Sequence, residues 1–114
     1  MLAAEAERRG QAIISGLEEL AAAGKKDSAR LEELRVDAHG LKGAALVVGE
    51  DRLADLARLI EDFLRERVES GQVEPATAAP AIAAVSALTE GAQAAAEGVA
   101  EPSSVGESMQ ALAP

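Results

Sequence analysis

The chain of 114 residues has no cysteine, no tryptophan, no tyrosine and a single phenylalanine, Phe63. Without cysteine, disulfide bonds and thiolate metal sites are excluded. The scarcity of aromatic residues disfavours β-sheets, which use aromatic and β-branched side chains. Apolar residues make up 48% of the chain and are mainly Ala, Leu, Val and Ile, a composition that favours helices.

Basic charge and long apolar runs are also lacking. The formal net charge is −9, and no basic cluster with interleaved aromatic residues is present, so nucleic-acid binding is not expected. No apolar run approaches the ~20 residues that span a bilayer, and the N-terminus lacks the pattern of a secretory signal. One histidine without cysteine supports no metal site. We therefore expect a cytoplasmic protein that binds neither nucleic acid nor membranes.

Helical periodicity extends over four segments of the sequence. They cover residues 2–23, 29–48, 52–70 and, starting at Pro75 or Thr77, a last segment that reaches residue 97. The second segment has the most regular apolar stripe, at Leu31, Leu34, Ala38, Leu41, Ala45 and Val48. Gly24, Gly49 and Gly71 are expected to end the first three helices. This pattern predicts an all-α fold, an up-down-up-down four-helix bundle over residues 1–98.

The composition shifts after residue 98 towards proline, serine and glycine. Such a composition predicts a flexible tail or linker over residues 99–114. A short extra C-terminal helix around residues 104–112 is the alternative.

The only histidine, His39, lies in the second predicted helix close to two glycines, Gly40 and Gly43. A glycine in a helix interior costs about 1 kcal/mol relative to alanine, so this pair suggests a functional reason. Helical spacing places Arg35, Lys42 and Gly43 on the same face as His39, at the border between core and solvent. For Gly40 the sequence suggests only relief of crowding beside a docked partner.

A turn at Gly49 would bring Arg58 and Glu61 of the third helix level with His39. We predict that the Glu61 carboxylate accepts the Nδ1–H of His39, which leaves the Nε2 lone pair free. We expect this nitrogen to act as a nucleophile that takes a phosphoryl group, and Lys42 could then neutralise part of the charge of that group. Gly43 would leave space for the partner that delivers or removes this group.

The run His39-Gly40-Leu41-Lys42-Gly43-Ala44 resembles the motif of histidine-containing phosphotransfer (HPt) domains, which is histidine, any residue, an apolar residue, lysine, glycine and a small residue. Further matches are Gly49, Leu53, Leu56 and the run Ile60-Glu61-Asp62-Phe63-Leu64. Together they make residues 5–95 look most like the N-terminal phosphotransfer domain of chemotaxis-type CheA kinases.

This resemblance implies that His39 is phosphorylated, that Lys42 and Gly43 serve the phosphoryl group and that Glu61 orients the histidine. The partners implied are the catalytic domain of a histidine kinase and the receiver domain of a response regulator. The chain would need no cofactor of its own, because Mg²⁺ and ATP belong to the kinase. Arg58 stands where the chemotaxis subgroup often has a second histidine, and Gly40 replaces a more usual hydroxyl residue.

Simpler interpretations exist for each of these residues. A lone histidine is usually structural, Gly43 could permit close helix packing, and Glu61 could pair with Arg58 or Arg65 on the surface. A small alanine-rich bundle is expected to leave little room for a substrate cleft, which favours a phosphocarrier over an independent enzyme. The alternative function is a helical-bundle interaction or dimerisation module that docks a receiver without being phosphorylated. Whether the chain is free-standing or a fragment of a histidine kinase stays open.

Overall fold

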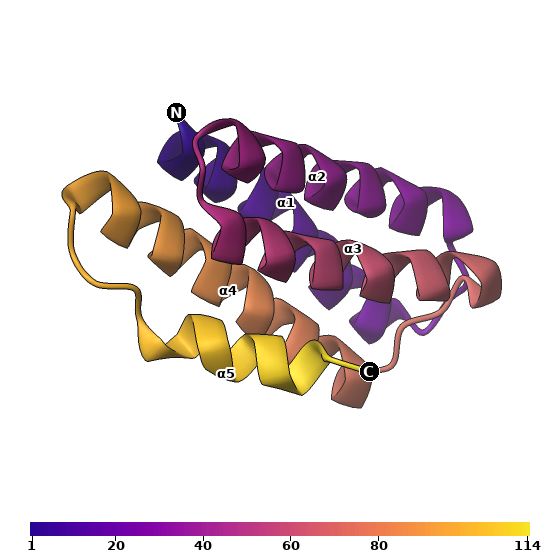
Figure 1. Cartoon of the computed structure of the whole chain (residues 1–114). Helices are drawn as coiled ribbons and strands as arrows, with labels where there is room; N and C mark the ends of the chain where they lie inside the picture. The colour runs from indigo at the N-terminus through magenta and orange to yellow at the C-terminus, as the bar shows by residue number, and fades with distance from the viewer.

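The computed structural model describes all residues 1–114 and contains helices only, as the composition predicted. Four long helices are followed by a short one (Figure 1). The helices are α1 (Leu2–Ala23), α2 (Ser28–Val47), α3 (Asp51–Ser70), α4 (Pro75–Glu97) and α5 (Ser103–Leu112). The predicted bounds of the long helices agree with these to within one residue, with α4 starting at the earlier of its two expected positions.

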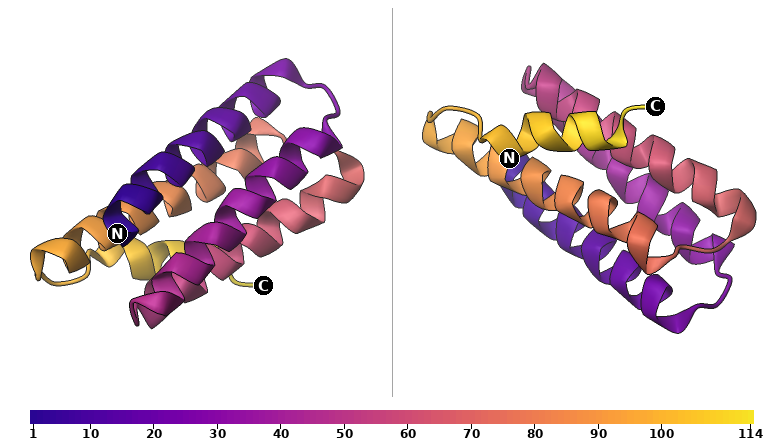
Figure 2. Two further views of the ribbon diagram at one scale, coloured as in Figure 1. Left: turned by 90° about the horizontal axis from the view of Figure 1, so that it is seen from above. Right: turned by 90° about the horizontal axis from the view of Figure 1, so that it is seen from below.

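The four long helices pack as an antiparallel bundle, so the predicted up-down-up-down arrangement is confirmed (Figure 2). Each helix packs along its neighbours in the order α1, α2, α3, α4 and back to α1, whereas the diagonal pairs do not approach closely. The apolar stripe of α2 is buried from Leu31 to Ala45, but Val48 at its end is exposed. None of the helices combines the length and apolarity that crossing a bilayer requires.

A tight connection joins α2 to α3 and sets the register of the two helices. Gly49 has a φ of 77°, a left-handed conformation that glycine adopts without strain. The N–H of Glu50 reaches back to the carbonyl of Ala45 at 2.9 Å and closes the last turn of α2. Because the connection is so short, α3 runs back directly along α2, and positions equally distant from the turn lie level.

The end of the chain differs from the flexible tail that its composition predicted. Residues 103–112 form α5, the alternative considered, and this helix packs on α3 and α4. Val105 is fully buried and belongs to the main hydrophobic core. It fits against Gly91 of α4, where an added Cβ would lie 3.1 Å from Val105 Cγ2 and 2.6 Å from Leu53 Cδ2. This fit depends on residues distant in the sequence, which local composition does not reveal.

We predict that Val105→Ala lowers the free energy of unfolding by about 2 kcal/mol, because it removes two buried methyl groups from the core. Urea denaturation followed by circular dichroism measures this change. Val99→Ala is the matched control, since Val99 is 58% exposed and the same truncation there should change stability by less than about 0.5 kcal/mol. Equal effects of the two substitutions would contradict the packing of α5.

Candidate functional site

His39 lies in the middle of α2 at the border of the core. The preceding residue Ala38 and the nearby Leu41 are each 1% exposed, whereas the imidazole of His39 is 61% exposed. The buried stripe fixes the helix below the ring, and the ring itself remains open to solvent. Such a position allows a partner protein to reach the histidine without any opening of the bundle.

Glu61 of α3 contacts the imidazole from the neighbouring helix, as the hairpin geometry predicted. Its carboxylate Oε2 lies 3.1 Å from Nδ1 of His39. Only 1% of Glu61 is exposed, and it is the only charged residue among the buried ones. In the tautomer with hydrogen on Nδ1, the ring donates this hydrogen to Glu61 and keeps a lone pair on Nε2.

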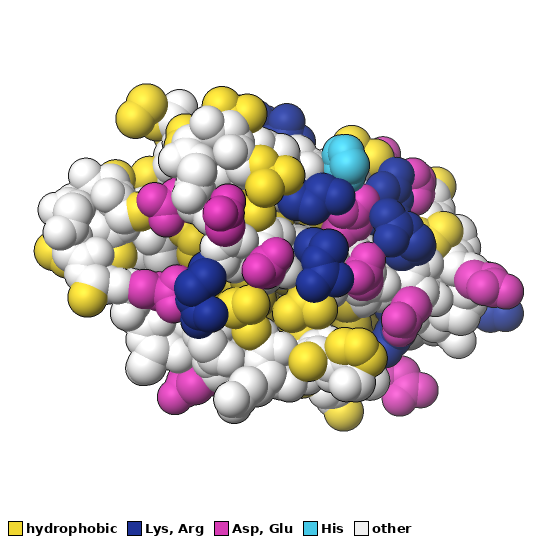
Figure 3. All heavy atoms as spheres, viewed as in Figure 1, with side chains coloured by type: hydrophobic (Ala, Val, Ile, Leu, Met, Phe, Trp, Pro, Cys, Tyr) yellow, Lys and Arg dark blue, Asp and Glu magenta, His cyan; other side chains and the backbone are white.

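Besides His39, the side chains of three cations surround the buried carboxylate. Oε2 of Glu61 accepts hydrogen bonds from Arg35 Nη1 at 2.9 Å and from Arg65 Nη2 at 3.0 Å. Oε1 pairs with Lys42 Nζ at 3.4 Å. On the face formed by α2 and α3, Figure 3 shows the histidine among lysine and arginine side chains. A buried anion is thus compensated by basic groups from both helices, although the whole chain carries a net charge of −9.

The ionisation of Glu61 follows from this arrangement. Burial raises the pKa of the carboxyl, but the hydrogen bonds and charges of His39 and Lys42 outweigh burial. The pKa of Glu61 therefore lies below its ordinary value of 4.5, and the group is a carboxylate at neutral pH. Its negative charge is available to the imidazole over the physiological range.

Lys42 and Gly43 have different surroundings although they are adjacent. Lys42 is bound to Glu61 and is 28% exposed, so in this structure its charge faces the carboxylate. An added Cβ at Gly43 would meet no atom within 4 Å. The alternative that Gly43 permits close helix packing is therefore wrong, and the space beside it is open to solvent.

Gly40 gains a physical explanation that the sequence did not provide. A Cβ at this position would lie 2.8 Å from Cζ of Arg9, whose guanidinium crosses from α1 to α2. Arg9 pairs there with Asp37 at 3.0 Å and with Glu5 at 3.2 Å. Gly40 therefore lies against an ion-pair network that connects α1 to the helix of His39, and a side chain there would displace the flexible end of Arg9.

Two arginines of the site have a larger part than the sequence predicted. Arg35 was expected near His39 without a role, and Arg65 was expected only as a surface partner of Glu61. The spacing of four residues between Glu61 and Arg65 was the available signal, because such residues are neighbours on a helix. Arg58, which was expected level with His39, pairs with Asp62 at 3.3 Å instead of with Glu61.

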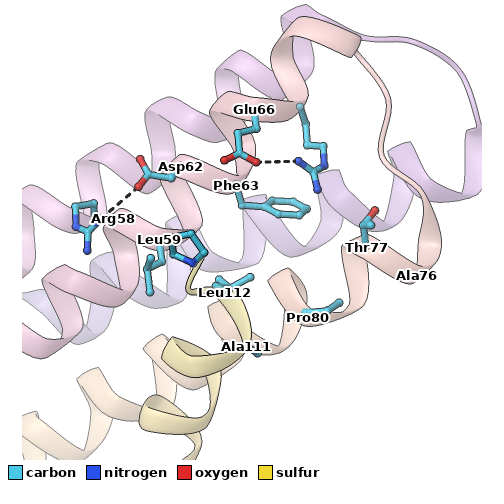
Figure 4. A pocket seen from close by; sticks show the side chains of 12 residues that line it. Arg58, Leu59, Asp62, Phe63, Glu66, Ala76, Thr77, Pro80, Ala111 and Leu112 are labelled. Carbon is cyan, nitrogen blue, oxygen red and sulfur yellow. Dashed lines mark hydrogen bonds and ion pairs between the residues drawn. The ribbon is translucent and has the colours of Figure 1, made fainter.

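A groove of about 500 Å³ lies between α3, α4 and α5 (Figure 4). Phe63 of α3, Pro80 of α4 and Leu112 of α5 are among its lining residues, and Arg67 lies over the Phe63 ring at 4.4 Å. The expectation of little room for a cleft is therefore wrong, because α5 forms one wall of this groove. None of the residues around His39 lines it.

The fold and the site define a helical bundle that presents one histidine held by a buried carboxylate. The Hpt domain family matches residues 1–98, which include the four long helices and leave α5 outside the match. No curated protein matches the chain at a significant level. The chain belongs to the Hpt domain family, whose members carry out histidine phosphotransfer in phosphorelays with kinases and response regulators.

We predict that Glu61→Gln destabilises the fold by about 2 kcal/mol at pH 7, because it removes the charge that three cations and His39 share. The pKa of Glu61 in the folded state lies below the ordinary 4.5. Its carboxylate therefore contributes stability above about pH 4.5, and this contribution is lost as the pH falls through the folded-state pKa. Urea denaturation across this range should show that the difference in free energy of unfolding between wild type and variant becomes smaller towards low pH.

Glu66→Gln is the matched control for this experiment, because Glu66 lies on the same helix and is 73% exposed. Its effect should stay below about 0.5 kcal/mol at every pH. If the free energies of unfolding of wild type and Glu61→Gln differ equally at neutral and at acidic pH, the ionisation of Glu61 cannot be the source of the difference.

Proposed function

We propose that this domain carries a phosphoryl group on Nε2 of His39, as a chemotaxis-type phosphotransfer domain in two-component signal transduction. The observation that carries the proposal is the contact between Nδ1 of His39 and the buried carboxylate of Glu61. This contact engages Nδ1 and leaves Nε2 free for reaction, on a ring that is exposed to solvent. Glu61 itself supports the likeness to CheA kinases, since it matches the glutamate that the resemblance assigns to orienting the histidine.

The proposed step uses the lone pair of Nε2. In the loading step the γ-phosphorus of ATP forms a bond to Nε2 while its bond to the ADP oxygen breaks, and ADP leaves. Nδ1 keeps its hydrogen, so the ring becomes cationic and its charge is stabilised by Glu61. In the unloading step an aspartate oxygen of a receiver domain bonds the phosphorus, the Nε2–P bond breaks and the ring returns to its neutral form.

The catalytic domain of a histidine kinase would supply Mg²⁺ and ATP for loading, and a response regulator would receive the phosphoryl group. This dependence on ATP is consistent with a cytoplasmic location. Lys42 would offset charge on the phosphoryl oxygens, and Gly43 would let the partner approach. Leu46, two helical turns beyond His39, is 55% exposed and is the proposed docking contact for the receiver.

The alternative is a bundle that docks a receiver or a second copy without phosphorylation. The geometry favours the carrier, because a docking surface alone has no need of a buried carboxylate aimed at an exposed histidine. Burying a charge is expensive unless several partners compensate it. The four partners of Glu61 are this compensation, and one of them is His39, the only histidine of the chain.

We predict that a histidine kinase catalytic domain with Mg²⁺ and radioactive ATP labels the wild-type domain and fails to label His39→Gln. The phosphoryl group should be acid-labile and base-stable, as expected of a bond to nitrogen. Glu33→Gln is the control on the same helix, and it should be labelled at the wild-type rate because Glu33 is 70% exposed.

Label that persists in His39→Gln would contradict the assignment. If wild type is never labelled, and receiver binding and downstream output are unchanged in His39→Gln, the unphosphorylated docking module would be the correct interpretation.

We predict that Gly43→Ala raises the free energy of unfolding by about 1 kcal/mol yet slows transfer to the receiver about tenfold. Alanine is the better helix former, and its methyl group has space in the isolated domain but would crowd an approaching partner. Gly106→Ala in α5 is the matched control, since a Cβ there makes only an ordinary contact at 3.5 Å with Arg52. This control should also gain stability and keep the wild-type transfer rate.

The transfer rate is measured from the purified phosphorylated domain to a receiver, so the effect on transfer is separated from the effect on stability. Equal rates for Gly43→Ala and Gly106→Ala would show that no partner approaches at Gly43.

A further inference from the structure

One oxygen of the buried carboxylate has more donors than it can fully accept. Three groups reach Oε2 of Glu61, namely Arg35 at 2.9 Å, Arg65 at 3.0 Å and His39 at 3.1 Å. A carboxylate oxygen offers two lone pairs in its plane, so three donors compete for two favourable positions. The other oxygen, Oε1, has only Lys42 at 3.4 Å. At least one donor on Oε2 is therefore weakly held.

The two arginines differ in how firmly they are tied. Arg35 is 22% exposed, and its Nε and Nη2 donate to Glu32 at 2.8 and 2.7 Å. Its guanidinium is thus held on two sides. Arg65 is 58% exposed and has one other partner, the half-exposed Asp62, at 3.0 Å. Arg65 is therefore the donor that leaves Oε2 at the lower cost.

Arg65 also lies near the imidazole that would carry the phosphoryl group, on the side of Nδ1. Its Nη2 and Nδ1 of His39 bond the same oxygen, so the guanidinium is within two hydrogen-bond lengths of the imidazole. A phosphoryl group on Nε2 brings two negative charges and three acceptor oxygens to the exposed side of this ring. Arginine binds such oxygens in pairs with its planar guanidinium.

We propose that Arg65 is a transferable cation, which binds Glu61 in the unmodified domain and binds the phosphoryl group after His39 is phosphorylated. This proposal rests on the proposed function, because it takes His39 as the phosphorylated residue. When Arg65 leaves Oε2, two donors remain for two lone pairs, Arg35 and the Nδ1–H of His39. Phosphorylation thus strengthens the bond that stabilises the cationic ring, and the arginine neutralises the new charge.

Potassium phosphoramidate provides a test that needs no kinase. Its P–N bond breaks, ammonia leaves and a bond from phosphorus to Nε2 of His39 forms. The lifetime of the phosphorylated domain is then followed by ³¹P NMR. Arg65→Gln should lose the phosphoryl group about fivefold faster than wild type, because bonds to the phosphoryl oxygens stabilise charge that a loose transition state disperses. Arg65→Lys, which keeps the positive charge, should recover part of the lifetime.

Arg52→Gln is the matched control, since Arg52 lies on the same helix, is 57% exposed and pairs with Glu101, outside the site. The phosphorylated Arg52→Gln domain should have the same lifetime as the phosphorylated wild type. A second readout uses the wild-type protein alone, in which the guanidinium NMR signals of Arg65 should shift on phosphorylation more than those of Arg52. Equal lifetimes of Arg65→Gln and Arg52→Gln, or unshifted Arg65 signals, would overturn the proposal even if a kinase labels His39.

Discussion

The carboxylate of Glu61 lies in the contact between α2 and α3, where 1% of the residue is exposed. A charge in such a place must be compensated, and the compensation comes from basic groups of both helices. This requirement links the packing of the hairpin to the chemistry of the histidine, because one of the compensating groups is His39 itself. The interaction engages Nδ1 of the imidazole, while the ring itself stays 61% exposed.

The glycines around His39 serve two different purposes. Gly40 faces α1 and lies against the guanidinium of Arg9, which joins α1 to α2 through its ion pair with Asp37. Gly43 faces open space and has no packing role in the domain. One of these weak helix formers therefore lies against a neighbouring helix, and the other lies on an open surface. The two positions are three residues apart, yet only their surroundings distinguish them.

The Hpt match ends at residue 98, whereas the packed structure continues through α5. Val105 completes the core against Gly91 and Leu53, and Arg52 pairs with Glu101 at 3.0 Å ahead of the helix. The fifth helix covers the side of the bundle formed by α3 and α4, so it leaves the face of His39 free. The groove beside Phe63 is a consequence of this addition.

By itself, the sequence determined the number and bounds of the long helices, since apolar periodicity and the terminating glycines are local signals. It also determined that Glu61 lies level with His39, because a short turn leaves a hairpin only one register. The tertiary structure alone decided the fold of residues 103–112, the placing of Arg9 beside Gly40 and which of the possible arginines binds the Glu61 carboxylate. These depend on contacts between side chains distant in the sequence or on long side chains with several possible partners, and no local pattern encodes which contact is made.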